Sequence, residues 1–339
     1  MPSQPDFVLY INKEPPNWSD VELVFEHTQS SKETVTTKFL QWLRNAWSVF
    51  HHQPFRRHLY GIIFQKPYAF ICYADHGCAV YSKPLDFVKV AQHTQFLIDF
   101  LTGFIANPEH RGRDPTVQEL DEVHIHHAGR WWVEFGNLLW YRPCLVGRNI
   151  RVAQVKLQHQ PNILRTSVVM KSSWEEILPP ESSPPSEIEV LKILLKANVR
   201  GLPRPYALDH AIVEDNRGLE VVTRSFPENC DVALQASTAD HMKKMMASFV
   251  SNRTSKPLAP GASVGDPSLQ RIKVQRKQFN QPLKVRRQLT RVIMSYCTPL
   301  KEAMRDGCPE QLMRSIRDAM IVYYEAYKLP ESGFIQGGK

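Results

Sequence analysis

The sequence predicts an α+β protein, because segments with helical periodicity alternate with short apolar strands along its 339 residues. Residues 36–50 place apolar side chains at the spacing of one helical face. Residues 58–83 form three short strand-like runs rich in β-branched and aromatic residues, separated by turns. Residues 88–107 have the composition of a second helix that ends at Gly and Asn-Pro signals. These observations predict an N-terminal α+β domain over residues 1–120, with a strand meander at its centre.

The apolar stripe of the first helix is the strongest single pattern in this domain. Its members are Phe39, Leu40, Leu43, Trp47 and Phe50. Such a stripe predicts a face packed against a sheet. Beside it, Asp20 and Glu26 flank a strand candidate and suggest two alternatives, a carboxylate pair for a divalent cation or a solvated strand end. The short spacing and the lack of a suitably placed lysine favour the solvated strand end.

A second domain is expected over residues 121–339, where strands dominate and helices come late. Its expected elements, in order, are strands within 124–158 and 165–173, a helix over 186–199, strands at 210–215 and 219–226, a flexible basic insertion at about 251–287, a strand at 289–296 and a helix over 308–329. Ser186 is the expected N-cap of the first of these helices. The insertion combines Pro, Gly and Ser with many Lys and Arg residues and a single acid, Asp266.

Composition excludes several classes of protein. No apolar run approaches the roughly 20 residues that cross a bilayer, and the start of the chain lacks the pattern of a secretory signal. We therefore expect an intracellular protein, cytoplasmic or nuclear, with no membrane partner. The six cysteines contain no CxxC pair, which argues against a disulfide scaffold and a cysteine zinc site.

The formal net charge of +8 raises the question of nucleic-acid binding. Much of the excess lies in the basic insertion, where Phe279 is the one aromatic residue between positions 251 and 282. Stacking platforms for bases are therefore lacking there, so a solvated linker is favoured over a nucleic-acid site. His124 and His126 could face one side of a strand, but no further ligand is evident and a metal site is disfavoured.

Lys171 ends an apolar strand, and the helix that follows carries Glu187 and Glu189. An ammonium in a dry cleft needs a carboxylate partner. We expect Glu189 to be that partner, since Glu187, two residues away, points to a different helix face. The alternative is a solvated lysine and an exposed glutamate with no relation to each other.

In this order, the motifs LVGRNIRV, SVVMKSSW, the helix running into GLPRP, LTRVIMSYCTPL and SIRDAM resemble the fungal-type protein kinase family, and the N-terminal strings WSDVELVFEH, FRRHLYGIIFQ and GRDPTV are similar to its N-terminal extension. The resemblance implies a protein-kinase-like small lobe, an antiparallel sheet plus one helix, followed by the first helices of an incomplete large lobe. It also implies ATP with magnesium and phosphorylation of protein Ser or Thr.

Carried over residue by residue, the resemblance assigns nucleotide contacts to four positions. Gly147 would let the backbone approach a phosphate, Val152 would cover the adenine, and Lys171 paired with Glu189 would hold the α- and β-phosphates. Asn149 departs from the pattern, because such turns usually carry a second glycine there. ATP and a protein partner are thus the candidate ligands.

The catalytic loop of the family has the form His-x-Asp, and here Gln336 and Gly338 stand at those positions. The Asp accepts the substrate proton, and later Asn and Asp residues hold the magnesium ions. Because no residues for the catalytic or metal-binding roles are found, we expect a pseudokinase or truncated product that does not transfer phosphate. The alternative is a non-enzymatic interaction module formed by the N-terminal domain and the small lobe.

Overall fold

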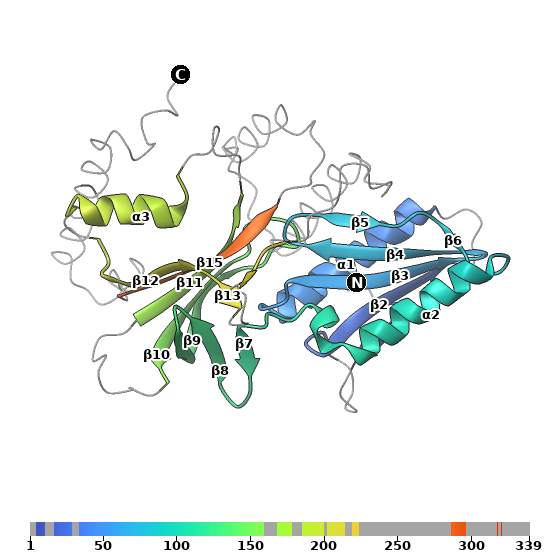
Figure 1. Cartoon of the computed structure of the whole chain (residues 1–339), viewed down its shortest axis with the longest axis horizontal. Coiled ribbons are helices and arrows are strands. Elements are labelled where there is room, and N and C mark those ends of the chain that lie inside the picture. The colour runs from blue at the N-terminus through green and yellow to red at the C-terminus, as the bar shows by residue number, and fades with distance from the viewer. Residues whose placement is uncertain are drawn as a thin grey trace, which may run out of the picture. The chain divides into compact units, whose positions relative to one another are not determined.

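The structure is a computed structural model (Figure 1). It describes residues 5–10, 17–28, 34–158, 168–177, 185–199, 202–213, 219–223, 286–295, 317 and 320. These residues form two compact units, with the division between Gly112 and Arg113. Residues 251–285 of the expected basic insertion lie outside the described residues. So does most of the expected C-terminal helix, of which Arg317 and Met320 are described and helical.

The first unit is a mixed sheet with one helix on each face. Its elements are β1 (Phe7–Tyr10), β2 (Val21–Thr28), α1 (Val35–His52), β3 (His58–Gln65), β4 (Tyr68–Asp75), β5 (Ala79–Tyr81), β6 (Leu85–Asp86), α2 (Ala91–Ala106) and the 3₁₀ turn η1 (Pro108–Arg111). The strand order is β1-β2-β3-β4-β5, and β6 pairs with β4. The expected helices and the meander of β3, β4 and β5 are confirmed. The strands β2 and β3 pair in parallel and are connected by α1, so a βαβ unit precedes the meander.

The buried face of α1 is shifted from the expected stripe. Trp42, Ala46 and Val49 are fully buried, whereas Leu40 and Trp47 are half-buried. Side chains of α1 buried in the core are Phe39, Trp42, Leu43, Ala46, Val49 and Phe50. The indole of Trp42 lies against the backbone of β3 at Gly61, where an added Cβ would overlap the indole nitrogen. Glycine is therefore required at this position for α1 to pack on the sheet.

Glu26 corrects the expectation of a solvated strand end. It lies within β2, and its side chain is fully buried. Asn45 of α1 donates a hydrogen bond from Nδ2 to Glu26 Oε1 at 2.5 Å. Burial, together with the charge of Asp6, raises the pKa of Glu26 to about 7. The carboxyl group is thus enclosed because α1 covers this face of the sheet.

The second unit is a seven-stranded antiparallel sheet with one helix that is described over its full length. Its elements are β7 (Val117–Glu119), β8 (Val123–His127), β9 (Arg130–Arg142), β10 (Ile150–Leu157), β11 (Val168–Glu176), α3 (Glu187–Lys196), β12 (Pro205–His210), the short pair β13 (Ile212–Val213) and β14 (Leu219–Glu220), and β15 (Arg287–Ser295). The order is β12-β15-β11-β10-β9-β8-β7. The expected helix and the strands corresponding to β8–β11, β13, β14 and β15 are confirmed. The edge strand β12 is not expected from the sequence.

A buried ion pair links β15 to the segment that precedes β7. Arg291 of β15 is 1% exposed, and its Nη2 lies 2.6 Å from Asp114 Oδ2. The same guanidinium donates to Thr116 Oγ1 at 2.7 Å and to the His126 carbonyl at 3.2 Å. His126 belongs to β8, which three strands separate from β15 in the sheet order. The sheet therefore curls until its two ends are bridged across one face.

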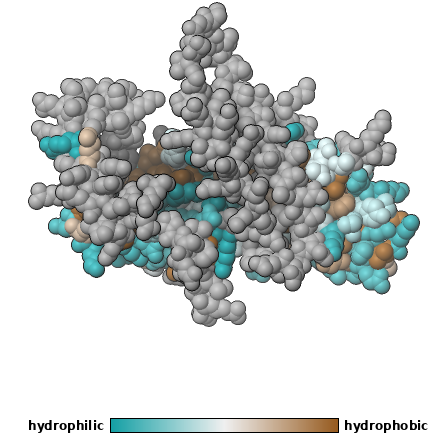
Figure 2. Space-filling model, turned by 90° about the horizontal axis from the view of Figure 1, so that it is seen from above, coloured by the Kyte–Doolittle hydropathy of each residue, from teal (hydrophilic) through white to brown (hydrophobic). Residues whose placement is uncertain are grey.

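The surface of the first unit is mostly polar, with single apolar residues between the polar ones. On the face seen in Figure 2, the described surface of the first unit is largely hydrophilic, with apolar residues scattered among polar ones. Such isolated residues are ordinary on folded domains. None of the helices in the described part of the chain has the length and apolar character needed to cross a membrane.

Candidate kinase-like nucleotide site

One row of side chains runs across five strands of the second unit. Lys171 of β11 lies directly opposite Val152 of β10 and Val292 of β15. Val152 in turn lies opposite Trp140 of β9, and Val292 lies opposite Leu208 of β12. Because directly opposed residues of antiparallel strands share a face, these side chains line one surface of the sheet. Arg151, Ser172 and Arg291 form the neighbouring row and lie on the other face, where the Asp114 ion pair is buried.

The helix α3 follows this sheet and begins with a complete capping box. The Ser186 side chain accepts a hydrogen bond from the backbone N–H of Glu189 at 3.2 Å. The Glu189 carboxylate accepts one in return from the backbone N–H of Ser186 at 2.6 Å. These hydrogen bonds hold the pKa of Glu189 below its ordinary value. Glu189 is therefore occupied in starting the helix.

The partner of Lys171 is Glu187, and the expected pairing with Glu189 is wrong. Lys171 Nζ lies 2.5 Å from Glu187 Oε1, and about a quarter of each side chain is exposed. Glu187 is the first residue of α3, where a carboxylate is also favoured by the helix dipole. The two glutamates do face different sides of the helix, as the spacing predicts. The side that faces β11 belongs to Glu187, because Glu189 turns back to the cap.

Arg148 adds a second cation that the sequence reasoning did not single out. Its Nη2 lies 3.4 Å from Glu187 Oε2 and 3.3 Å from Glu175 Oε1. Its carbonyl accepts a hydrogen bond of 2.6 Å from the backbone N–H of Trp174, which ties the turn to β11. The site thus contains two cations and two carboxylates, with Glu187 shared between Lys171 and Arg148.

The turn that carries Arg148 has the backbone geometry of a tight loop. Gly147 has φ +141°, and an added Cβ would lie 2.8 Å from the Cys144 sulfur. Asn149 has φ +34°. Asparagine is one of the few residues other than glycine that adopt such angles readily. Asn149 therefore replaces the usual second glycine without preventing the turn.

Electrostatics in this cluster depend on its partial burial. Burial raises the pKa of Glu175, and the charge of Glu187 raises it further. Arg148 and Lys171 oppose this effect. Removing either cation should therefore raise the pKa of Glu175 further.

In protein kinases the third strand of the small lobe carries a lysine that forms an ion pair with a glutamate of the next helix. Here β9, β10 and β11 are successive antiparallel strands, Lys171 lies on the third, and α3 follows with Glu187. The family model described as fungal protein kinase matches residues 4–329. The chain belongs to the fungal protein kinase family. Comparison with curated proteins and with solved structures gave no match.

Membership of the fungal protein kinase family covers both units, since the match begins at residue 4. Two strings that carry the resemblance meet in space. Asp114 of GRDPTV and Arg291 of LTRVIMSYCTPL form the buried ion pair described above. The segment GFIQGG, with Gln336 and Gly338, lies outside the described residues.

Trp140 is another residue of the site that the sequence reasoning missed. Its side chain is 60% exposed although it lies opposite Val152 on the face of Lys171. An aromatic residue within a strand, close to the glycine turn, is the sequence signal that could have revealed it.

No group of three or more His, Cys, Asp or Glu side chains within the described ranges could hold a metal ion. We therefore assign no magnesium ligand there.

Proposed function

We propose that the second unit binds ATP on the face of its sheet that carries Lys171. The observation that carries this proposal is the ion pair between Lys171 and Glu187. Lys171 would hold the α- and β-phosphates, Glu187 would keep its ammonium in place, and the backbone at Gly147 would approach the phosphates. Val152 and Trp140 would pack against the adenine.

The residues present suit the nucleotide in two respects. A polyphosphate needs converging cations, and the ammonium of Lys171 and the guanidinium of Arg148 both contact Glu187. The adenine needs flat apolar surface, which Val152 and the exposed ring of Trp140 supply on the same sheet face. The bound nucleotide would bring the transferable γ-phosphoryl group. The residues of this chain would bind and orient it.

We further propose that the 339-residue chain does not itself transfer phosphate. If the segment GFIQGG is aligned with the catalytic loop of the family, Gln336 and Gly338 stand at the positions of its His and Asp. Neither a glutamine nor a glycine side chain can accept the proton of a substrate hydroxyl as a carboxylate does. The family activity, phosphorylation of protein Ser or Thr, would then need a carboxylate that neither of these two positions supplies.

Thermal unfolding with and without ATP and magnesium tests the binding proposal. At a 100-fold excess of ATP over its Kd, binding stabilises the folded unit by about 2.7 kcal/mol, a shift of several degrees in Tm. The variant Lys171→Met should lose most of this shift. If ATP leaves wild-type Tm unchanged, the alternative of a non-enzymatic interaction module gains support.

A phosphate-transfer assay with radiolabelled ATP and a protein substrate tests the proposal that the chain does not transfer phosphate. Transfer by the wild-type chain that is abolished in Lys171→Met would contradict that proposal.

A further inference from the structure

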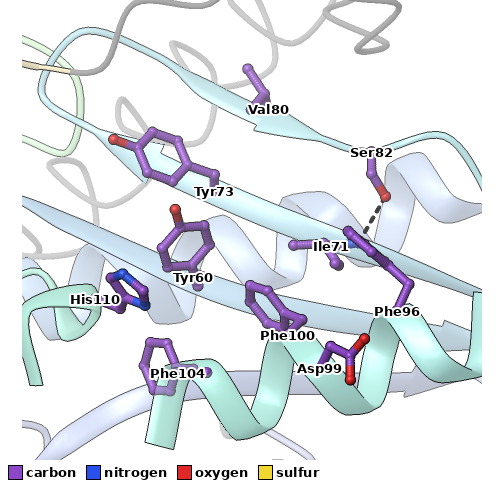
Figure 3. A pocket seen from close by; sticks show the side chains of 11 residues that line it. Tyr60, Ile71, Tyr73, Val80, Ser82, Phe96, Asp99, Phe100, Phe104 and His110 are labelled. Atoms are coloured by element: carbon purple, nitrogen blue, oxygen red, sulfur yellow. Dashed lines mark hydrogen bonds between the residues drawn. The ribbon is translucent and has the colours of Figure 1, made fainter. Parts of the chain in front are cut away.

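The first unit contains a cavity of about 480 Å³ on the face of its sheet that α2 covers (Figure 3). Tyr60, Tyr73 and Val80 lie opposite one another on β3, β4 and β5 and form part of its wall. Phe100 and Phe104 of α2 line the other side. A volume of this size matches sites for small organic molecules, which usually measure about 300–1,000 Å³.

A glycine within α2 enlarges this cavity. Gly103 lines it, and an added Cβ at Gly103 would have no heavy atom within 4 Å. Glycine in a helix interior costs about 1 kcal/mol relative to alanine. Close packing does not require glycine here, in contrast to Gly61. The effect of Gly103 is to leave room at the cavity wall.

The chemistry of the wall selects the charge of a ligand. Tyr60 lies edge-on to Tyr73 and to Phe100, with ring centroids 5.2 Å and 5.5 Å away. No Lys or Arg occurs among the described lining residues, His110 is their one imidazole, and Asp99 is their one carboxylate. Gln95 donates a hydrogen bond of 2.8 Å to Asp99, which stays exposed at the rim. Aromatic walls and a carboxylate favour a cation and disfavour anions such as nucleotides.

We propose that this cavity binds a small organic cation with a flat aromatic body. The body lies among Tyr60, Tyr73 and Phe100, and the positively charged group points to Asp99. The site is separate from the proposed ATP site, because each of its described lining residues belongs to the first unit.

Three indoles that differ in charge test the proposal on the full chain. They are tryptamine, a cation, tryptophol, which is neutral, and indole-3-propionate, an anion. Binding is measured by saturation-transfer NMR titration at low ionic strength. Tryptamine should bind about 3- to 10-fold more tightly than tryptophol, as expected for one partly exposed charge contact and cation–π attraction. Indole-3-propionate should bind most weakly.

Two variants locate the site. Gly103→Leu fills the cavity and should weaken all three indoles at least about 10-fold, without lowering Tm, because leucine forms helix better than glycine. Thr102→Leu, an exposed neighbour on the same helix that does not line the cavity, is the matched control and should bind as wild type. Asp99→Asn should remove the preference for tryptamine and leave tryptophol unchanged.

Three results would overturn the proposal. They are no binding of any indole by the wild type, unchanged binding by Gly103→Leu, and tighter binding of indole-3-propionate than of tryptamine. Tryptamine binding should persist in Lys171→Met. Failure of the ATP proposal would therefore leave this result intact, and the reverse also holds.

Discussion

Glu187 and Glu189 lie two residues apart in the first turn of α3 and contact different partners. Glu187 contacts Lys171, whereas Glu189 contacts the Ser186 backbone. Glu187→Gln should therefore weaken ATP binding about 10-fold, because the Lys171 ammonium loses its ionised partner. Glu189→Gln should leave ATP affinity unchanged and cost at most about 1 kcal/mol of unfolding free energy through the cap. Titration with a fluorescent ATP analogue and urea unfolding measure the two effects. Equal losses of affinity in both variants would contradict this assignment.

Arg148, the second cation of the site, should also contribute to ATP affinity. Its side chain is 52% exposed, and both of its carboxylate contacts exceed 3.2 Å, so it is free to turn toward a phosphate group. Arg148→Gln should weaken ATP binding about 5- to 10-fold, since a charge-assisted contact of this kind contributes about 1–1.5 kcal/mol. Adenosine, which lacks phosphates, should bind equally to both proteins. Arg130→Gln, an exposed arginine of β9, serves as control. Tighter ATP binding by Arg148→Gln would mean that Arg148 blocks the site.

The misassigned glutamate shows what residue spacing predicts and what it misses. The sequence correctly predicts a strand that carries Lys171, followed by a helix that carries the glutamates, because strand and helix periodicities are local. It could also have revealed the capping box, since Ser186 and Glu189 have the S-x-x-E spacing. Because its carboxylate accepts a hydrogen bond in this cap, Glu189 does not pair with Lys171. The choice of Glu187, and the approach of Arg148, depend on how α3 and the turn pack on β11, which no local pattern encodes.

Among elements, β12 and β2 show the same limit. Pro203 and Pro205 make the start of β12 resemble a loop, yet β12 lies at the edge of its sheet, where proline costs no interior hydrogen bond. The parallel pairing of β2 with β3 joins strands separated by a helix. Sequence patterns therefore predict the strand β2 without its pairing partner, and they miss β12 because of its prolines. The strands of the β3–β5 meander were predictable because short turns connect them.

The buried ion pair of Asp114 with Arg291 should stabilise the curled sheet. Asp114→Ala or Arg291→Met leaves the other charge buried without its partner and should cost about 3–5 kcal/mol of unfolding free energy. The double variant should cost less than the sum of the two, because it leaves no uncompensated charge. Urea unfolding of the three variants measures this coupling.

A nearby exposed ion pair provides the control for this cycle. Arg113 and Glu119 contact at 3.2 Å with 37% and 43% of their side chains exposed. Breaking that pair in Arg113→Ala should cost less than about 1 kcal/mol. Similar losses of unfolding free energy in Arg113→Ala and Arg291→Met would contradict a special contribution of the buried ion pair.

Each of the two units contains a buried group whose titration affects stability, and the two effects have opposite signs. In the first unit, burial and the charge of Asp6 raise the pKa of Glu26 to about 7. In the second, burial and the charge of Arg291 lower the pKa of His127 to about 4. Between its unfolded pKa of about 4.5 and its folded value, Glu26 holds a proton that the unfolded chain releases. Between about 6.5 and 4, unfolded His127 gains a proton that the folded unit excludes.

Lowering the pH from 7.5 to 5.5 should therefore stabilise the first unit through Glu26 and destabilise the second through His127. At about 1.4 kcal/mol per pKa unit, the changes are about 2 kcal/mol and about 1.4 kcal/mol. Calorimetry of the wild type, Glu26→Gln and His127→Phe at both pH values measures them. Glu26→Gln keeps an acceptor for Asn45 and should abolish the gain of the first unit at low pH, leaving the second unit unaffected. His127→Phe should abolish only the loss of the second unit. If each variant changed the pH response of both units equally, the two groups would not be acting within separately folded units.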